Sequence, residues 1–84
     1  MYIHVGENIM VRADEMIVML AKETVQASEQ MQKLLEEKEE QIIDIANGPY
    51  KSIVFTESDI YLSPIATSTL KRQITELNNH ALFI

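Results

Sequence analysis

The chain has 84 residues, a formal net charge of −6 and no cysteine. This length allows one domain, residues 1–84, with a small core that self-association would stabilise. The lack of cysteine excludes disulfides and thiolate zinc sites, and the acidic balance disfavours nonspecific binding to anionic surfaces.

No membrane or targeting segment is expected. The longest apolar run, "MIVMLA" at 16–21, is far shorter than a bilayer span, and no charged leader precedes a hydrophobic stretch. We therefore expect a cytoplasmic protein with no membrane role.

The first twelve residues predict a β-hairpin. Tyr2, Ile3 and Val5 favour a strand, "GEN" at 6–8 has turn chemistry, and "IMV" at 9–11 resumes the apolar run.

The run "MIVML" at 16–20 predicts a third strand. It lacks alternation, which indicates that the strand is covered on both faces. A domain this small covers both faces of a strand only with difficulty, so we expect a partner subunit to supply the missing cover.

The period then changes to that of a helix. Met31, Leu34, Leu35 and Ile42 lie roughly on one helical face, and Ser28 is a candidate N-cap. The tract "EEKEE" at 36–40 is typical of a solvated face; the alternative is a recognition surface for basic partners.

Three strands follow in the sequence, at "IIDIA" (42–46), "KSIVFT" (51–56) and "IYLS" (60–63). Asn47-Gly48 favours positive φ, and the short connections predict a mostly antiparallel meander.

A last helix is capped by Thr67 or Ser68, and its apolar face is Leu70, Ile74 and Leu77. The segment "NNHALFI" (78–84) ends this helix and leaves an apolar tail. The predicted order is β-β-β-α-β-β-β-α, an α+β fold with a small, mostly antiparallel sheet and two helices.

Catalysis is poorly supported. His4 and His80 lie near opposite ends of the chain without a ligand spacing, and Ser68 lacks the glycine-flanked turn of an activated nucleophile. We expect no catalytic residue, no metal site, no cofactor and no small-molecule substrate.

Basic and hydroxyl side chains form the one candidate binding set. Hydroxyls at a helix start, free helix N–H groups and flanking cations are the groups that hold phosphate oxygens. The alternative is that Ser68 only caps the helix and the cations only face solvent. The set comprises Arg12, Lys51, Ser68, Thr69, Lys71 and Arg72.

Two stretches, "MYIHVG" at the start and "KSIVFTESDIYLSPIATSTLKRQ" at 51–73, resemble the bacterial extracellular-matrix regulator family, RemA and RemB. The resemblance is closer to the RemB type. It implies a cytoplasmic, oligomeric regulator of biofilm-matrix genes that binds duplex DNA and assembles into rings. The DNA contacts would come from Lys51, Ser68, Lys71 and Arg72, with Arg12 added from composition. The predicted subunit interface comprises Met16, Ile17, Val18, Leu82 and Phe83.

The sequence departs from the RemA pattern at two places. RemA-like members have arginines where this chain has Pro49 and Tyr50, and an arginine where it has Glu15. The alternative function is therefore a non-enzymatic, oligomeric protein-interaction module of the same fold that has lost DNA binding.

Overall fold

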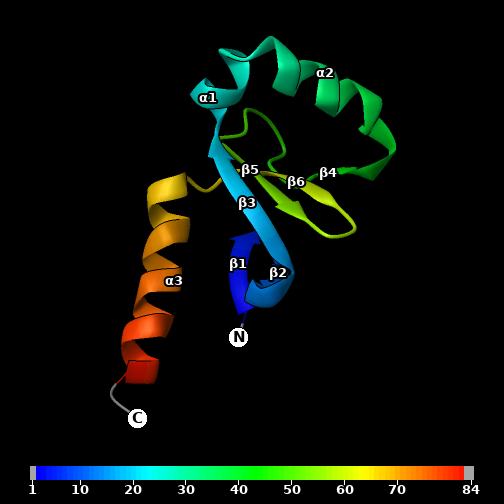
Figure 1. The fold of residues 1–84 in the computed structure, drawn as a ribbon. Helices are drawn as coiled ribbons and strands as arrows, with labels where there is room; N and C mark the ends of the chain where they lie inside the picture. The colour runs from blue at the N-terminus through cyan, green and yellow to red at the C-terminus, as the bar shows by residue number, and fades with distance from the viewer. Residues whose placement is uncertain (1, 83–84) are drawn as a thin grey trace.

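The computed structural model describes residues 2–82, with side chains through residue 75 (Figure 1). The strands are β1 (Tyr2–Gly6), β2 (Ile9–Arg12), β3 (Met16–Ala21), β4 (Ile42–Asp44), β5 (Ser52–Thr56) and β6 (Ile60–Ser63). The helices are α1 (Lys22–Gln26), α2 (Glu29–Glu37) and α3 (Thr67–Leu82), with 3₁₀ turns at Ala13–Glu15 and Glu39–Gln41. The α+β class and the order of strands are confirmed, while the first expected helix is divided into α1 and α2.

The strands form two sheets rather than one. β1 and β2 make the expected hairpin, and the other four strands lie in the order β3-β5-β6-β4. The pairs β3–β5 and β5–β6 are antiparallel, but β4 pairs in parallel with β6. The predicted meander is therefore wrong at β4, which pairs with the outer edge of β6 instead of with β5, the next strand in sequence.

The side chains of the four-stranded sheet alternate between two cores. Val54 packs with Ile3, Val5 and Leu70 in what we call the hairpin-side core, which the β1–β2 hairpin and α3 cover. The neighbouring Ile53 points the other way, into a core that α1 and α2 cover, here called the helix-side core. This alternation is the period of two that a strand imposes on its side chains.

The turn between β1 and β2 depends on a glycine. Gly6 has φ +146°, and a Cβ built on it would lie 2.8 Å from Cδ of Pro64. Only glycine allows both this backbone conformation and this close approach. Asn47 likewise has the positive φ, 54°, that its Asn-Gly sequence predicted.

The first expected helix is interrupted at Ala27. α1 ends at Gln26, and Ser28 caps α2 by accepting a hydrogen bond from the Met31 N–H at 3.2 Å. Met31 and Leu35 then pack on the helix-side core, as predicted. Ile42 was wrongly assigned to this helical face; it lies in β4, after the chain has left α2.

β3 is not covered on both faces within one chain, so the cover that the sequence predicts from a partner subunit stays a prediction. Ile17 is 67% exposed and Val18 is 41% exposed. Two features explain this: the register of β3 with β5 shifts between Met16 and Val18, and α2 has only nine residues. A helix of that length spans about 14 Å and leaves the start of β3 uncovered.

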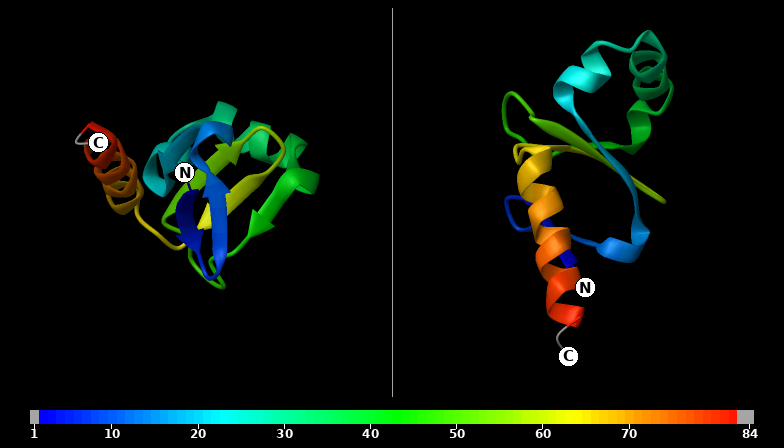
Figure 2. Two further views of the ribbon diagram at one scale, coloured as in Figure 1. Left: turned by 90° about the horizontal axis from the view of Figure 1, so that it is seen from below. Right: turned by 60° about the vertical axis from the view of Figure 1, so that its left-hand side comes forward.

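α3 packs on the hairpin side of the sheet, as Figure 2 shows. Leu70 is fully buried and Ile74 packs beside it, which confirms these two positions of the predicted apolar face. The helix begins at Thr67, and the N–H groups of Thr69 and Leu70 donate to the Ala66 carbonyl. The N-cap position is therefore Ala66, and neither Thr67 nor Ser68 occupies it.

α3 continues to Leu82, within the segment where it was expected to end. The predicted roles of Leu77, His80, Leu82 and Phe83 lie outside the described side chains. No helix in the described part of the chain is long and apolar enough to cross a membrane.

Candidate nucleic-acid interface

The predicted cations Lys51, Lys71 and Arg72 come to one side of the molecule through two different elements. Lys51 precedes β5 and is held by its backbone: its N–H donates to the Ser63 carbonyl at 2.8 Å. Ser63 ends β6 and leads into the corner that starts α3. The same corner therefore fixes Lys51 and the first turns of α3.

Lys71 and Arg72 follow the fully buried Leu70 on α3 and are both exposed. Because Leu70 and Ile74 turn one face of the helix to the core, the next positions project outward. Among residues 2–75, no carboxylate lies within ion-pair distance of Lys51, Lys71 or Arg72.

A fourth cation, Lys22, was missed in the sequence. β3 pairs with β5 up to Ala21 and Ser52, so the next residue of β3 meets the residue before β5. The Lys22 N–H accordingly donates to the Lys51 carbonyl at 3.0 Å. Only the pairing of these two strands, which lie 30 residues apart in sequence, could have revealed this neighbour.

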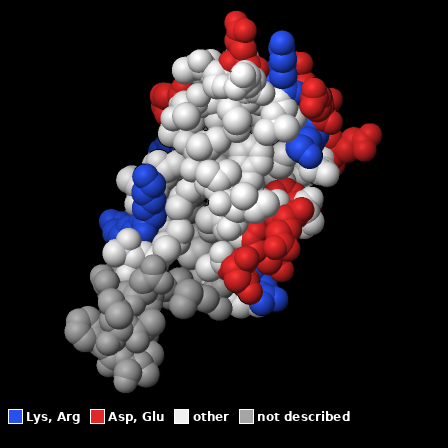
Figure 3. Space-filling view, viewed as in Figure 1, with Lys and Arg blue, Asp and Glu red and all other residues white. Residues whose placement is uncertain are grey.

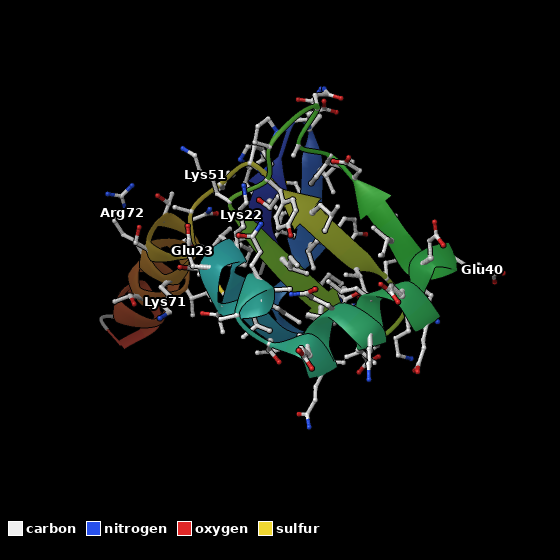
Figure 4. All side chains as sticks on the ribbon, turned by 90° about the horizontal axis from the view of Figure 1, so that it is seen from above. Lys22, Glu23, Glu40, Lys51, Lys71 and Arg72 are labelled. Atoms are coloured by element: carbon white, nitrogen blue, oxygen red, sulfur yellow. The ribbon has the colours of Figure 1, made fainter. Side chains whose placement is uncertain are left out.

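Figure 4 shows the four cations along one side of the molecule, with Glu23 among them and Glu40 on the opposite side. The Lys22 ammonium lies 5.6 Å from the centre of the Tyr50 ring, a cation–π contact that limits its freedom. In the space-filling view, cations gather beside α3, while most acids lie on the other side (Figure 3). We call Lys22, Lys51, Lys71 and Arg72 the cationic edge.

Arg12 does not join the cationic edge. Its guanidinium donates to the Asp14 carboxylate at 2.7 Å and lies 4.0 Å from that of Glu15. The charge of Asp14, together with its hydrogen bond and the charge of Glu15, raises the pKa of Arg12. Arg12 is thus already paired with two neighbouring acids.

Ser68 is exposed in the first turn of α3, near the start of the helix but not at its cap. Its hydroxyl therefore remains a candidate donor to a ligand at this end of the helix. Thr69 is half-buried beside it.

The described residues were also compared with the requirements of a metal site. No group of three or more His, Asp or Glu side chains among them could hold a metal ion. The His4 ring nitrogen Nε2 lies 2.6 Å from the Glu7 carbonyl, within its own turn. This places His4 in the hairpin, as predicted.

The two stretches that carried the family resemblance meet in space. The buried Ser63 hydroxyl donates to the Val5 carbonyl and accepts from the Ile65 N–H at 3.0 Å. The adjacent Pro64 packs on Gly6. The first strand and the Ser-Pro corner therefore form a single junction, which we call the hairpin–corner junction.

α3 is attached to the same junction through Gln73. Its side-chain Oε1 accepts from the His4 N–H at 2.9 Å, and its Nε2 donates to the His4 carbonyl at 3.0 Å. The amide thus binds both backbone groups of His4, as a neighbouring strand would. This pair of bonds fixes α3, and with it Lys71 and Arg72, against β1.

Two of the positions where the sequence departs from the RemA pattern, Tyr50 and Glu15, make contacts within the chain. Tyr50 packs on the helix-side core beneath Lys22, and Glu15 lies beside Arg12.

The fold and the cationic edge define a small α+β protein with a cluster of cations on one side. A family model described as RemA-like, extracellular matrix regulatory protein A-like, matches residues 2–74. The chain is also 34% identical over 73 residues to extracellular matrix regulatory protein B of Bacillus subtilis (strain 168), covering 87% of this chain and 89% of that protein. The chain therefore belongs to the RemA-like family of extracellular matrix regulatory proteins. Membership confirms the resemblance and supports a regulatory role.

Proposed function

We propose that this protein is an oligomeric, DNA-binding regulator that acts in the bacterial cytoplasm on genes of the extracellular matrix. Lys51, Lys71 and Arg72 contact phosphates of duplex DNA, and Lys22 adds charge to the same edge. Ser68 donates from the first turn of α3. Arg12 is left out, because its charge is engaged by Asp14 and Glu15.

The observation that carries this proposal is the convergence of cations in an acidic chain. The chain has seven Lys and Arg residues, and four of them lie along one side (Figure 4). A local concentration of positive charge attracts a polyanion even when the net charge of the protein is −6. The start of α3 adds backbone N–H groups that suit phosphate oxygens.

Because each subunit makes few phosphate contacts, tight binding requires several copies of the cationic edge on one duplex. Three or four phosphate contacts give weak binding at physiological salt, because each contact displaces counterions and weakens as salt rises. An oligomer that presents the cationic edge several times on one duplex gains affinity through effective concentration. Self-association, as a ring in the family's manner, is therefore part of the proposal.

The test compares two lysines on exposed helical surfaces. Lys71→Ala removes a cation of the edge, whereas Lys33→Ala removes one from α2 with the same change in net charge. In fluorescence anisotropy with unrelated duplexes, Lys71→Ala should weaken binding about tenfold, since a hydrogen bond to a charged group contributes about 1.5 kcal/mol. Lys33→Ala should leave affinity within about twofold. Equal effects of the two variants would contradict an edge-specific contact.

A second candidate function is a non-enzymatic interaction module of the same fold. The uncovered apolar side chains Ile17 and Val18 favour it, since exposed apolar patches mark interaction sites. This candidate replaces the first if the wild-type protein self-associates but binds no duplex even at low salt.

A further inference from the structure

The loop that joins β4 to β5 contains an Asn-Gly pair, Asn47 and Gly48. Both residues are exposed, and a Cβ built on Gly48 would have nothing within 4 Å. Among the described residues, no acceptor lies within hydrogen-bond reach of the Gly48 N–H. The pair therefore combines a side-chain amide, a neighbouring unbonded N–H and open space around both.

These three features are what an asparagine needs to lose its amide without an enzyme. The Gly48 nitrogen attacks Cγ of Asn47, and its proton passes through solvent to the side-chain nitrogen, which leaves as ammonia. Water then opens the resulting five-membered succinimide at either carbonyl, so residue 47 becomes aspartate or isoaspartate. Glycine favours the attack, because it has no side chain to hinder the approach of its nitrogen.

The side chain of Asn47 is held by the turn between β1 and β2. Its Nδ2 donates to Oε1 of Glu7, which lies in that turn, 40 residues away in sequence. Both residues have positive φ, 54° for Asn47 and 47° for Glu7. Because the reaction requires the Asn47 side chain to rotate toward the Gly48 nitrogen, the bond to Glu7 restrains it.

We propose that Asn47 is a modification site, at which deamidation through Gly48 releases the β4–β5 loop from the β1–β2 turn. In the unmodified chain, an amide donates to the Glu7 carboxylate. In the modified chain a second carboxylate takes its place, which repels Glu7 and adds one negative charge to the net charge of −6. Isoaspartate also lengthens the main chain of the loop by one methylene group.

Asn8 provides a matched control within the same molecule. It is exposed like Asn47 and lies in the same β1–β2 turn as Glu7, but it precedes the β-branched Ile9. Branching at Cβ hinders the approach of the Ile9 nitrogen to the Asn8 side chain. Two exposed asparagines should therefore react at different rates.

Peptide mass spectrometry of the 84-residue chain, incubated folded in mildly alkaline buffer, tests the site. Asn47 should deamidate at least about tenfold faster than Asn8, and Gly48→Ala should slow it at least about tenfold. Glu7→Lys removes the acceptor and should speed the reaction about fivefold, as expected for the loss of one hydrogen bond. Glu57→Lys makes the same change of charge in another exposed connection and should leave the rate within about twofold.

Asn8 also reports on folding in this experiment. If Glu7→Lys unfolded the chain, both asparagines would react faster, whereas the loss of one contact affects Asn47 alone. Equal rates at Asn47 and Asn8 in the wild type overturn the modification site. Equal rates at Asn47 in the Glu7→Lys and Glu57→Lys variants overturn the restraint by Glu7.

A charge-reversal cycle tests the release of the loop, and it does not depend on the cationic edge. Asn47→Asp places a carboxylate against Glu7 without waiting for the reaction, and it should lower the midpoint of urea denaturation. Adding Glu7→Lys to the same chain pairs opposite charges and should restore the midpoint. If Asn47→Asp lowers the midpoint equally with and without Glu7→Lys, or does not lower it at all, the release is overturned.

Discussion

The two faces of the four-stranded sheet differ in how completely one chain covers them. On the hairpin side, Ile3, Val5, Val54 and Leu70 are all fully buried. On the other side, α2 covers Ile53 and Ile60 but leaves the start of β3 bare. We call the hairpin side, which the chain itself covers, the finished face, and the other side, which it covers only in part, the unfinished face.

On the finished face, β1 contacts the corner that follows β6 and the helix α3. Ser63, Pro64 and Gln73 reach back to β1 by hydrogen bonds and close packing. The cations of α3 depend on these contacts for their position. The finished face therefore positions α3, whereas the start of β3 on the unfinished face stays exposed in the single chain.

The largest effect should come from Gly6→Ala at the finished face. The new methyl group would lie 2.8 Å from Pro64, and Gly48→Ala is the matched control, with the same φ of +146° but nothing within 4 Å. Both variants share the backbone strain, so Gly48→Ala should lower the free energy of unfolding by about 1 kcal/mol. Gly6→Ala should lower it by about 3 kcal/mol, because of the added overlap. Urea denaturation checks this, and equal losses would show that the contact with Pro64 relaxes freely.

A valine pair compares the two faces directly. Val54 is fully buried on the finished face, and Val18 is 41% exposed at the start of β3. Val54→Ala should destabilise the fold by about 2 kcal/mol through lost burial and a cavity, and Val18→Ala by under ~1 kcal/mol. The measurement is urea denaturation of the monomer at low protein concentration. Similar losses would mean that the start of β3 is packed within the single chain.

Removing the amide of Gln73 should loosen α3 from β1. Gln73→Leu deletes both bonds to His4 and should lower the free energy of unfolding by about 1 kcal/mol. Hydrogen exchange should also rise at the His4 amide, whose N–H loses its acceptor. Gln32→Leu is the control, since Gln32 makes a single exposed bond to the Gln26 carbonyl. If hydrogen exchange at the His4 amide stays unchanged, the side chain of Gln73 does not attach α3 to β1.

The smallest effect concerns pH. Burial raises the pKa of Tyr61, and the charges of Asp59 and Glu15 raise it further. Because the folded state holds this proton more tightly than the unfolded state, its contribution is present below pH ~10 and is lost as pH rises further. Tyr61→Phe should flatten that part of the stability curve in thermal melts between pH 9 and 11. If Tyr61→Phe leaves the dependence of stability on pH unaltered, the raised pKa of Tyr61 is contradicted.

Local features of the fold could be predicted from sequence, whereas strand partners could not. The hairpin at Gly6, the positive φ of Asn47 and the inward face of Leu70 and Ile74 all follow from short-range rules. The parallel pairing of β4 with β6 depends on β5 lying beside β3, which no local pattern specifies. The sequence predicts Ser28 as an N-cap, as found for α2, but it does not predict the separate short helix α1 that ends at Gln26.

The candidate site was predictable only in part for the same reason. Lys71 and Arg72 are adjacent in sequence, and their exposure follows from the buried Leu70 beside them. Lys22 joins Lys51 only through the β3–β5 ladder, so composition could not reveal it. Arg12 belongs to the predicted set because it is basic, and its ion pair with Asp14 is visible only in three dimensions.

The salt dependence of duplex binding tests the cationic edge most directly. We predict that log K for the wild type falls linearly with log salt between 50 and 200 mM, with each phosphate contact contributing roughly 0.9 to the slope. Lys71→Ala combined with Arg72→Ala should reduce that slope by about 2 per engaged subunit, on unrelated duplexes alike. A slope unchanged in the double variant, or no binding by the wild type at 50 mM salt, would contradict the account.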